Sequence, residues 1–207
     1  NQERIVQFDE TSRDFSRTSV SYPNFCDWGD QNDLFAAVAT CQTDSVRLKV
    51  GDRVEQVRLG LVSAGFFDVL GLRPLLGRAI TPTDDMKSAA PVAWITHSTW
   101  QHFFNGAPDV VGKTVIVDQR ELPVAGVLPA DFRFIRGMDV LVPLAPYAEE
   151  QFMTMRENHN GSLTLGLLQP GVSLAAARSR MNTVADRLQK EYPKANSGLG
   201  LVVETLH

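Results

Sequence analysis

The stretch "LVSAGFFDVLGLRPLLGR", Leu61 to Arg78, combines several strong local signals of structure. It begins as a strand and reaches Ser63, a residue type that caps the N-terminus of a helix. The short apolar helix that follows, residues 64–70, stops at Gly71, which suits a left-handed helix end. A proline and a second glycine then prevent further regular helix. The stretch therefore predicts strand, capped helix and extended segment, and it holds no nucleophile beside a base and no set of metal ligands.

The same order of strand, serine cap, helix and breaker recurs at residues 92–106 and 163–192. Ser98 is expected to cap a helix that runs through Phe104, and Ser173 to cap the longest helix, Leu174–Glu191. The lengths differ too much for a tandem repeat. Strand–helix alternation of this kind predicts βαβ-type units.

Hairpins lie between these units. The runs on either side of Gly51-Asp52 and of Asp118-Gln119 alternate apolar and polar residues, as paired strands do. A further helix is expected after Ser19 or Ser21, with Pro23 in its first turn. Hairpins mixed with βαβ units are typical of an α+β or an α/β fold, and we expect α+β.

Composition excludes several classes of protein. The chain has 207 residues, a net charge of −4, 43% hydrophobic and 21% charged residues, so it can bury a core without disulfides. The basic residues are dispersed, which argues against nucleic acid and anionic membrane surfaces as partners. The longest run without formal charge, Ser88 to Pro108, contains prolines, histidines and amides and is not a membrane helix. Asn1 begins without a methionine or signal peptide, so we expect a piece of a longer protein.

Two cysteines, Cys26 and Cys41, are too few for a disulfide scaffold. The expected state is two buried thiols, and a single bridge in an oxidising compartment stays open. Cys26 has no basic neighbour that would lower its pKa.

The stretch "GAPDVVGKT", residues 106–114, comes nearest to a nucleotide motif. A P-loop needs four residues between its two glycines and must open a helix, whereas here Gly106 is one residue too far from Gly112. Lys113-Thr114 also leads into a predicted strand. We expect a plain helix-to-strand loop.

The remaining polar candidates are weak as catalysts. His97 and Ser98 are adjacent at a helix start, where a cap serine and a partly buried histidine are the default. His97 and His102 are five residues apart, which does not suit metal ligands on one helix face, and His159 and His207 belong to no motif. Asp84-Asp85 is expected to be a solvated turn.

Two further features have ordinary readings. Asn160 fits a glycosylation sequon, which matters only in a eukaryotic secretory context. The aromatic residues are expected in the core; they are Phe25, Trp28, Trp94, Trp100 and Phe104. We therefore assign no catalytic, cofactor-binding or metal-binding residue and no cofactor, and we do not expect an enzyme. An enzyme hypothesis would rest only on His97, Ser98 and Asp84-Asp85.

Several segments, in order, resemble one family closely from about Val20 to Leu206. They are "VSYPNFCDW", "LVSAGFFDVLGLRPLLGRAITPTDD", "PVAWITHSTWQHFFNGAPDVVGKTVIVDQRELPVAGVLPADFRF", "DVLVPL" and "LLQPGVSLAAARSRMNTVADRLQKEYP". The chain resembles the MacB-like periplasmic core domain of FtsX-like ABC transporter permeases, in the manner of the large duplicated permeases of acidobacteria. Cys26 and Cys41 are not part of that pattern.

The resemblance implies a two-lobed domain inserted between the first two membrane helices of a bacterial inner-membrane permease, on the periplasmic side. One lobe, about residues 15–88 plus 161–207, would hold βαβ units like the porter modules of efflux pumps. The other, about residues 89–160, would be an inserted β-rich lobe.

The resemblance also implies a role. The domain would be a non-catalytic module that couples ATP hydrolysis by a cytoplasmic subunit or domain to the handling of substrates or partners outside the membrane. Its partners would be the membrane helices of the same permease, the ATPase and a periplasmic accessory protein; the isolated domain is expected to be a monomer. The alternative is a module that captures a hydrophobic peptide or lipid between its lobes.

Overall fold

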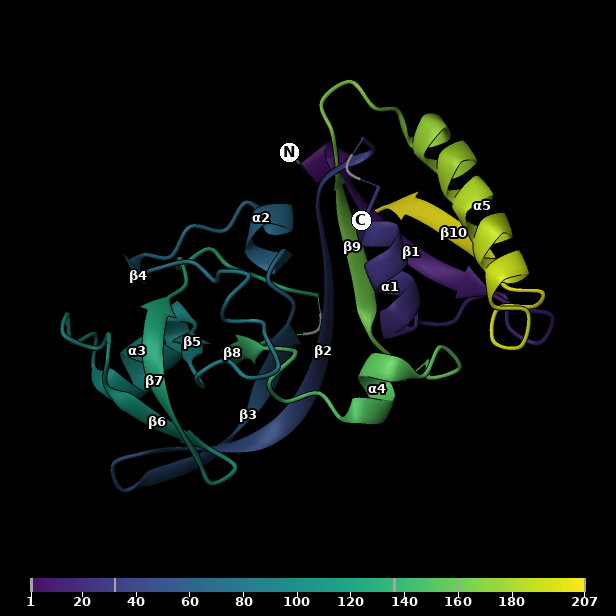
Figure 1. The fold of residues 1–207 in the computed structure, drawn as a ribbon. Coiled ribbons are helices and arrows are strands. Elements are labelled where there is room, and N and C mark those ends of the chain that lie inside the picture. Colours follow the sequence, from purple (N-terminus) through teal and green to yellow (C-terminus); the bar gives the residue numbers. More distant parts are fainter. Residues whose placement is uncertain (1, 32, 136, 160, 207) are drawn as a thin grey trace. The chain divides into compact units, whose positions relative to one another are not determined.

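The computed structural model describes residues 2–31, 33–135, 137–159 and 161–206 (Figure 1). The chain forms two compact units. Unit 1 comprises Asn1–Thr40, Asp68–Leu70 and Ala148–His207, and unit 2 comprises Cys41–Phe67 and Gly71–Tyr147.

The fold is α+β, as predicted, and strands dominate it. The helices are η1 Gln2–Arg4, α1 Tyr22–Gly29, α2 Phe66–Leu70, α3 His97–Phe104, α4 Glu150–Thr154 and α5 Leu174–Glu191. The strands are β1 Ile5–Thr11, β2 Phe35–Val50, β3 Arg53–Val62, β4 Leu76–Gly77, β5 Ala93–Ile95, β6 Thr114–Val117, β7 Arg120–Val127, β8 Val140–Pro143, β9 Leu163–Leu168 and β10 Gly200–Thr205.

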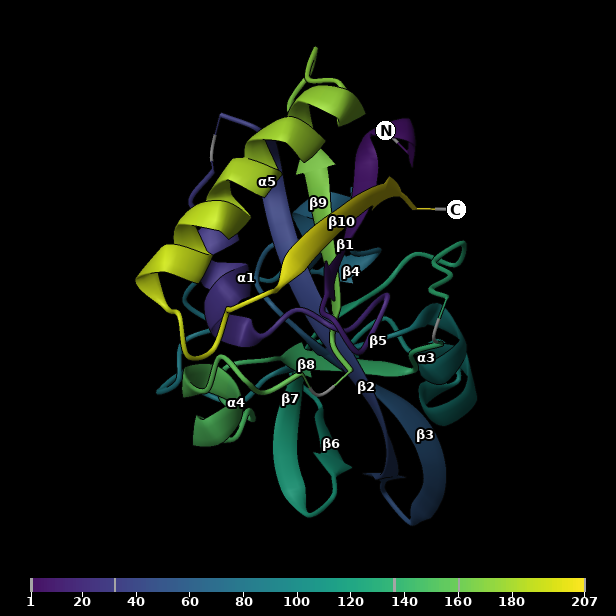
Figure 2. The same ribbon diagram turned by 90° about the vertical axis from the view of Figure 1, so that its right-hand side faces the viewer.

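Unit 1 is a sheet covered on one face by helices. Its strand order is β10-β1-β9 followed by the first part of β2, and β1 runs antiparallel to both β10 and β9. The apolar stripe of α5 and the aromatic residues of α1 pack against the same face of β1, in one buried cluster. Figures 1 and 2 show α5 lying along β10. Ser173 caps α5 as predicted, because its hydroxyl accepts a hydrogen bond from the backbone N–H of Ala176 at 3.1 Å.

Unit 2 is a closed ring of strands. From Cys41 onward β2 pairs with β3, β3 pairs parallel with β8, β8 with β5, β5 with β7, β7 with β6, and β6 returns to β2. Valine and leucine side chains of these strands fill the interior. The ring closes where Leu48 and Lys49 of β2 pair with Val117 and Ile116 of β6, so a hydrogen-bonded path of strands surrounds the apolar core.

The compact units differ from the predicted lobe limits. Residues 41–67 and 71–88, expected in the first lobe, belong to unit 2, and residues 148–159 belong to unit 1. The physical reason is the β2–β3 hairpin. Near its turn, β2 pairs with β6 at Leu48 and Lys49, and at its base β3 pairs with β8 from Leu59 to Val62, so the hairpin is part of the closed ring.

Two turns have the backbone conformation that the sequence predicts. Gly71 has a φ of 67° and ends α2, with the N–H of Leu72 bonded to the carbonyl of Phe67 at 2.8 Å. Asp118 and Gln119 both have positive φ, 42° and 76°, as a tight hairpin turn requires.

The start of α3 and the extent of β2 differ from the prediction. The N-cap of α3 is Thr96 rather than Ser98, since the Thr96 hydroxyl accepts from the N–H of Thr99 at 3.3 Å. The run before Gly51-Asp52 extends back to Phe35 as one long strand, β2.

Candidate functional site

His97 and Ser98 each contact other residues. The His97 ring packs edge-on against Trp100, with ring centroids 5.4 Å apart. The Ser98 hydroxyl lies 3.0 Å from the hydroxyl of Thr96. Among the described residues, no hydrogen bond joins His97 to Ser98 or to Asp84-Asp85, so the contact that an enzyme hypothesis requires is missing there.

Asp84 is a buried carboxylate bound by Arg78 and Thr81 rather than part of a solvated turn. Its carboxylate accepts hydrogen bonds from both terminal guanidinium nitrogens of Arg78, at 2.6 and 2.7 Å. It also accepts hydrogen bonds from the backbone N–H and the hydroxyl of Thr81, at 2.8 and 2.6 Å. The hydrogen bonds from Arg78, partly opposed by burial and supported by those from Thr81, lower the pKa of Asp84 to about 2. We call these three residues the Asp84 clasp.

The clasp extends into the core of unit 2. The carbonyl of Arg78 accepts the indole N–H of the buried Trp94 at 2.7 Å, and the guanidinium of Arg78 lies 5.6 Å from the Trp94 ring centroid. The expected solvated turn is therefore wrong at Asp84, which is 8% exposed.

Asp85 makes a second connection. Its two carboxylate oxygens accept the backbone N–H groups of Ala64, at 2.9 Å, and of Ala145, at 2.7 Å. Burial is the largest influence on Asp85 and raises its pKa. One carboxylate thus joins the turn that precedes α2 to the segment that follows β8, and it faces backbone rather than a cleft.

The other titratable candidates also have structural partners. Lys113 bonds Asp109 at 2.9 Å just before β6, so its ammonium group faces a carboxylate rather than a phosphate loop. His102 Nε2 lies 2.8 Å from Glu55. No group of three or more histidine, cysteine, aspartate or glutamate side chains within the described ranges could hold a metal ion. Asn160 and His207 lie outside the described residues.

No disulfide joins Cys26 and Cys41. Cys41 is buried as expected, whereas Cys26 is exposed on α1, so the prediction of two buried thiols is wrong for Cys26. Neighbouring groups still desolvate the Cys26 sulfur enough to raise its pKa, which does not favour a reactive thiolate.

The aromatic residues pack as predicted. Phe25, Trp28 and Trp94 are buried, and Trp100 and Phe104 are partly buried against the core of unit 2. No helix within the described part of the chain is long and apolar enough to cross a membrane.

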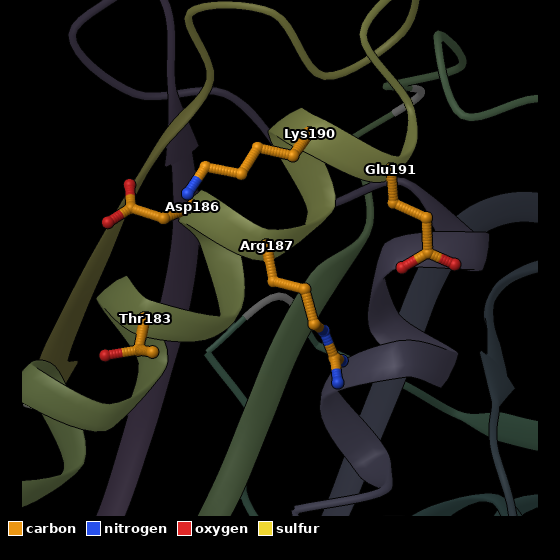
Figure 3. Close-up of a pocket in the computed structure, with 5 residues that line it drawn as sticks. All are labelled: Thr183, Asp186, Arg187, Lys190 and Glu191. Carbon is orange, nitrogen blue, oxygen red and sulfur yellow. The ribbon is translucent and has the colours of Figure 1, made fainter.

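The hollows of the surface are open. One, of about 540 Å³, is lined by Thr183, Asp186, Arg187, Lys190 and Glu191. Figure 3 shows that all five side chains project from α5 itself. Two acidic and two basic side chains give this surface no net charge, and the residues that line it all come from one helix, so no second element encloses it. This is a solvated helix face.

Two further hollows lie in unit 2. One, of about 420 Å³, covers the outer face of the β2–β3 and β6–β7 hairpins, around Lys49, Val54 and Ile116. The other, of about 270 Å³, lies between the start of α3 and the loop around Arg133. Arg133 donates to the carbonyls of its own loop, at Ala130 and Phe132. Neither hollow has an unpartnered buried polar side chain that would indicate a ligand.

The densest buried polar group lies in unit 1 around Glu10. Glu10 is 1% exposed, and Asn24, His159 and Asn196 gather near it. None of the sequence motifs described above predicts this cluster. The signal was present, because Glu10 has the same strand parity as the core residues Val6 and Phe8 and must therefore point inward.

Comparison with known proteins agrees with this architecture. The model of the MacB-like periplasmic core domain matches residues 4–184. The macrolide export ATP-binding/permease proteins MacB of Neisseria gonorrhoeae and Neisseria meningitidis are 32% identical over 104 residues, which is 50% of this chain and 16% of theirs. The aligned part of the chain thus spans about a sixth of the length of those relatives.

Solved structures share the fold. The periplasmic region of MacB from Actinobacillus actinomycetemcomitans has a TM-score of 0.69 at 18% identity, over 98% of this chain and 88% of that one. A domain of a putative permease protein from Porphyromonas gingivalis has a TM-score of 0.75 at 17% identity, over 100% of this chain and 92% of that one. The extracellular domain of the noncanonic ABC-type transporter YknZ from Gram-positive bacteria gives 0.66 at 15%, over 96% and 99%.

Proposed function

This chain belongs to the family of MacB-like periplasmic core domains, and we propose that it is a non-catalytic module that couples ATP hydrolysis in the cytoplasm to the handling of substrates or partners outside the membrane. The match of the family model over residues 4–184 carries the proposal. The Neisseria relatives are export proteins that combine ATP-binding and permease functions. For this chain, export and an ATPase partner are part of the proposal.

The architecture supports a mechanical role. A module that passes motion to a partner must keep its shape under load. Unit 2 has the required construction, because its strands form a closed hydrogen-bonded ring around an apolar core. The Asp84 clasp and Asp85 then fix the loops beside that ring through directional bonds.

The proposed partners follow from the same membership. They are the membrane helices of the same permease, an ATPase subunit or domain and a periplasmic accessory protein. The proposed location is the periplasmic face of the inner membrane. Within the described residues, the chemistry of the side chains favours no catalytic step, and a non-enzymatic role is part of the proposal.

The test uses the full transporter in nanodiscs and a version in which residues 2–206 are replaced by a short flexible linker. We expect basal ATP hydrolysis to remain and export, or stimulation by an accessory protein, to be lost. Export that continues at the original rate would contradict the proposal. Calorimetry of the 207-residue chain should show no binding of Mg-ATP, and saturable binding would contradict the assignment of nucleotide to another subunit.

The same preparation tests the alternative of ligand capture. Detergents and lipids with alkyl chains of increasing length should leave the midpoint of thermal unfolding unchanged if the chain is a coupling module. A saturable rise with one chain length would instead favour a lipid-binding module.

A further inference from the structure

A buried carboxylate in unit 1 depends on one histidine. The Glu10 side chain is 2% exposed, and a buried charge of this kind is stable only when a cation or several hydrogen bonds compensate it. Oε1 accepts the amide N–H of Asn24 at 2.6 Å. Oε2 lies 3.0 Å from His159 Nδ1 and accepts no aligned hydrogen bond within the described chain.

The other charged groups nearby are engaged elsewhere. Arg156 forms an ion pair with Asp27 at 2.6 Å and lies over the Tyr192 ring, 3.6 Å from its centroid. It also donates to Oδ1 of Asn24 at 2.5 Å, so it reaches Glu10 only through that neutral amide. Glu157 adds negative charge near His159, and the remaining close side chain, Asn196, is neutral. Among the described residues, His159 is therefore the cation in contact with Glu10.

His159 also fastens a loop. Its Nδ1 lies 2.7 Å from the carbonyl oxygen of Ser19, just before α1. Two further bonds follow along the same loop. The N–H of Gly161 donates to the Ser19 hydroxyl at 2.9 Å, and the hydroxyl of Ser162 donates to the carbonyl of Val20 at 3.0 Å. The loop between α4 and β9 is thus attached to the start of α1 beside Glu10.

We propose that Glu10 and His159 form a pH-sensitive latch, which holds the loop between α4 and β9 against β1 and the start of α1 when His159 is charged and releases it when His159 is neutral. This inference concerns unit 1 itself and does not depend on the proposed coupling role. A domain outside the cytoplasmic membrane would meet the pH of its surroundings directly.

The chemistry fixes the direction of the switch. Nδ1 faces two acceptors, the Ser19 carbonyl and Oε2, so it carries a proton in both charge states. Deprotonation therefore occurs at Nε2 and removes the positive charge beside Glu10. Contact with Glu10 is the largest cause that raises the pKa of His159. A raised pKa means that the latch is fully formed below about pH 6.5 and weakens as pH rises through the raised value.

The test is amide hydrogen exchange of the 207-residue chain between pH 5.5 and 8.5, with rates corrected for intrinsic exchange. We expect protection of residues 155–159 to fall with rising pH. The protection factor should fall tenfold for every unit by which the pKa of His159 in the attached loop exceeds the pKa of His159 in the released loop. Protection of α5 serves as the internal reference and should not follow this profile.

Variants separate the latch from other titrations. His159→Gln and Glu10→Gln should each give a pH-independent profile, because each removes one charge of the pair. The matched control is His102→Gln, which removes a histidine–glutamate pair of similar length whose side chains are 56% and 46% exposed. It should leave the profile unchanged. A flat profile in the unaltered chain, or one abolished by His102→Gln, would overturn the proposal, and the first of these needs no variant to fold.

Discussion

Replacing Asp84 by asparagine should destabilise unit 2 because it removes the charge at the centre of the Asp84 clasp. The side chain of Asp84 is 10% exposed and bonds Arg78 through both guanidinium nitrogens. Asparagine has nearly the same shape, so the packing around the clasp is kept while the charge is lost. Its amide oxygen can still accept from Thr81.

The magnitude follows from the pKa of Asp84. Folding lowers that pKa from 3.8 to about 2. Since one unit corresponds to about 1.4 kcal/mol, this shift sets an upper limit of about 2.5 kcal/mol on the contribution of the charged clasp to the free energy of unfolding near neutral pH. Arg78 is 49% exposed, so solvent screening reduces the expected contribution to about 2 kcal/mol. Because the folded pKa is the lower one, the stabilisation is fully present above about pH 4 and is lost as pH falls through about 2.

The assay is urea unfolding followed by tryptophan fluorescence, which reports on the buried Trp94 beside the clasp. Unfolding curves of the unaltered chain and of Asp84→Asn are compared at pH 7, 5 and 3. We expect a difference of about 2 kcal/mol at pH 7 and 5 that has begun to shrink at pH 3.

The matched control is Asp109→Asn. Asp109 also bonds one cation, Lys113, but on an exposed surface, and the urea midpoint should hardly move. If Asp84→Asn lowers the free energy of unfolding by less than about 0.5 kcal/mol at pH 7, the range of ordinary surface changes, the charge of Asp84 does not stabilise unit 2. The same conclusion follows if the difference in free energy between the two chains is equal at pH 3 and pH 7.

Three further predictions concern backbone, cap and thiol. Gly77→Ala should lower the free energy of unfolding by more than about 2 kcal/mol, because φ is 77° and an added Cβ would overlap a carbonyl of β7. Gly51→Ala, also at positive φ but in open space, should lower it by only about 1 kcal/mol, and thermal unfolding measures both. Thr96→Ala should destabilise α3 by about 1 kcal/mol and Ser98→Ala by much less, a difference that urea midpoints resolve and that would be reversed if the serine were the cap. A thiol reagent should label Cys26 quickly in the native chain and leave the second thiol unmodified until urea is added; equal labelling of both would contradict their different burial.

The fold was predictable where local chemistry decides the structure. The amphipathic pattern of α5 and its serine cap gave the bounds of that helix, because both act within one or two turns of the chain. Asp118-Gln119 and Gly71 were predictable for the same reason, since a tight turn and a helix end select residues that accept positive φ.

The closed ring of unit 2 was not predictable from these signals. The β6 strand pairs with β2 through Leu48↔Val117 and Lys49↔Ile116, residues almost seventy positions apart. Alternation shows that each run is a strand, but it does not show which strand lies beside it. The limits of the two units depend on that pairing, which is why the expected lobe at residues 15–88 differs from the compact units.

The polar sites were missed for a related reason. Asp84-Asp85 has the composition of a solvated turn, and only the tertiary structure brings Arg78 and the N–H groups of Ala64 and Ala145 to the two carboxylates. Glu10 was the exception, because its position two residues after Phe8 on a strand already implied an inward direction. A charged residue at a core-facing strand position is therefore a signal worth testing in related sequences.

The three buried or partly buried acids share a placement that bears on the proposed function. Each of Glu10, Asp84 and Asp85 fixes a loop; Asp84 and Asp85 bond backbone or Arg78, and Glu10 lines a small hollow of about 10 Å³. Apolar contacts are non-directional, whereas a charged hydrogen bond fails once its geometry is lost. A module that transmits movement needs loops that keep their position, and buried acids with backbone or cationic partners meet that need. On this reasoning the specification seen between Leu61 and Arg78 serves shape, and the Glu10 latch is the one such attachment whose strength varies near neutral pH.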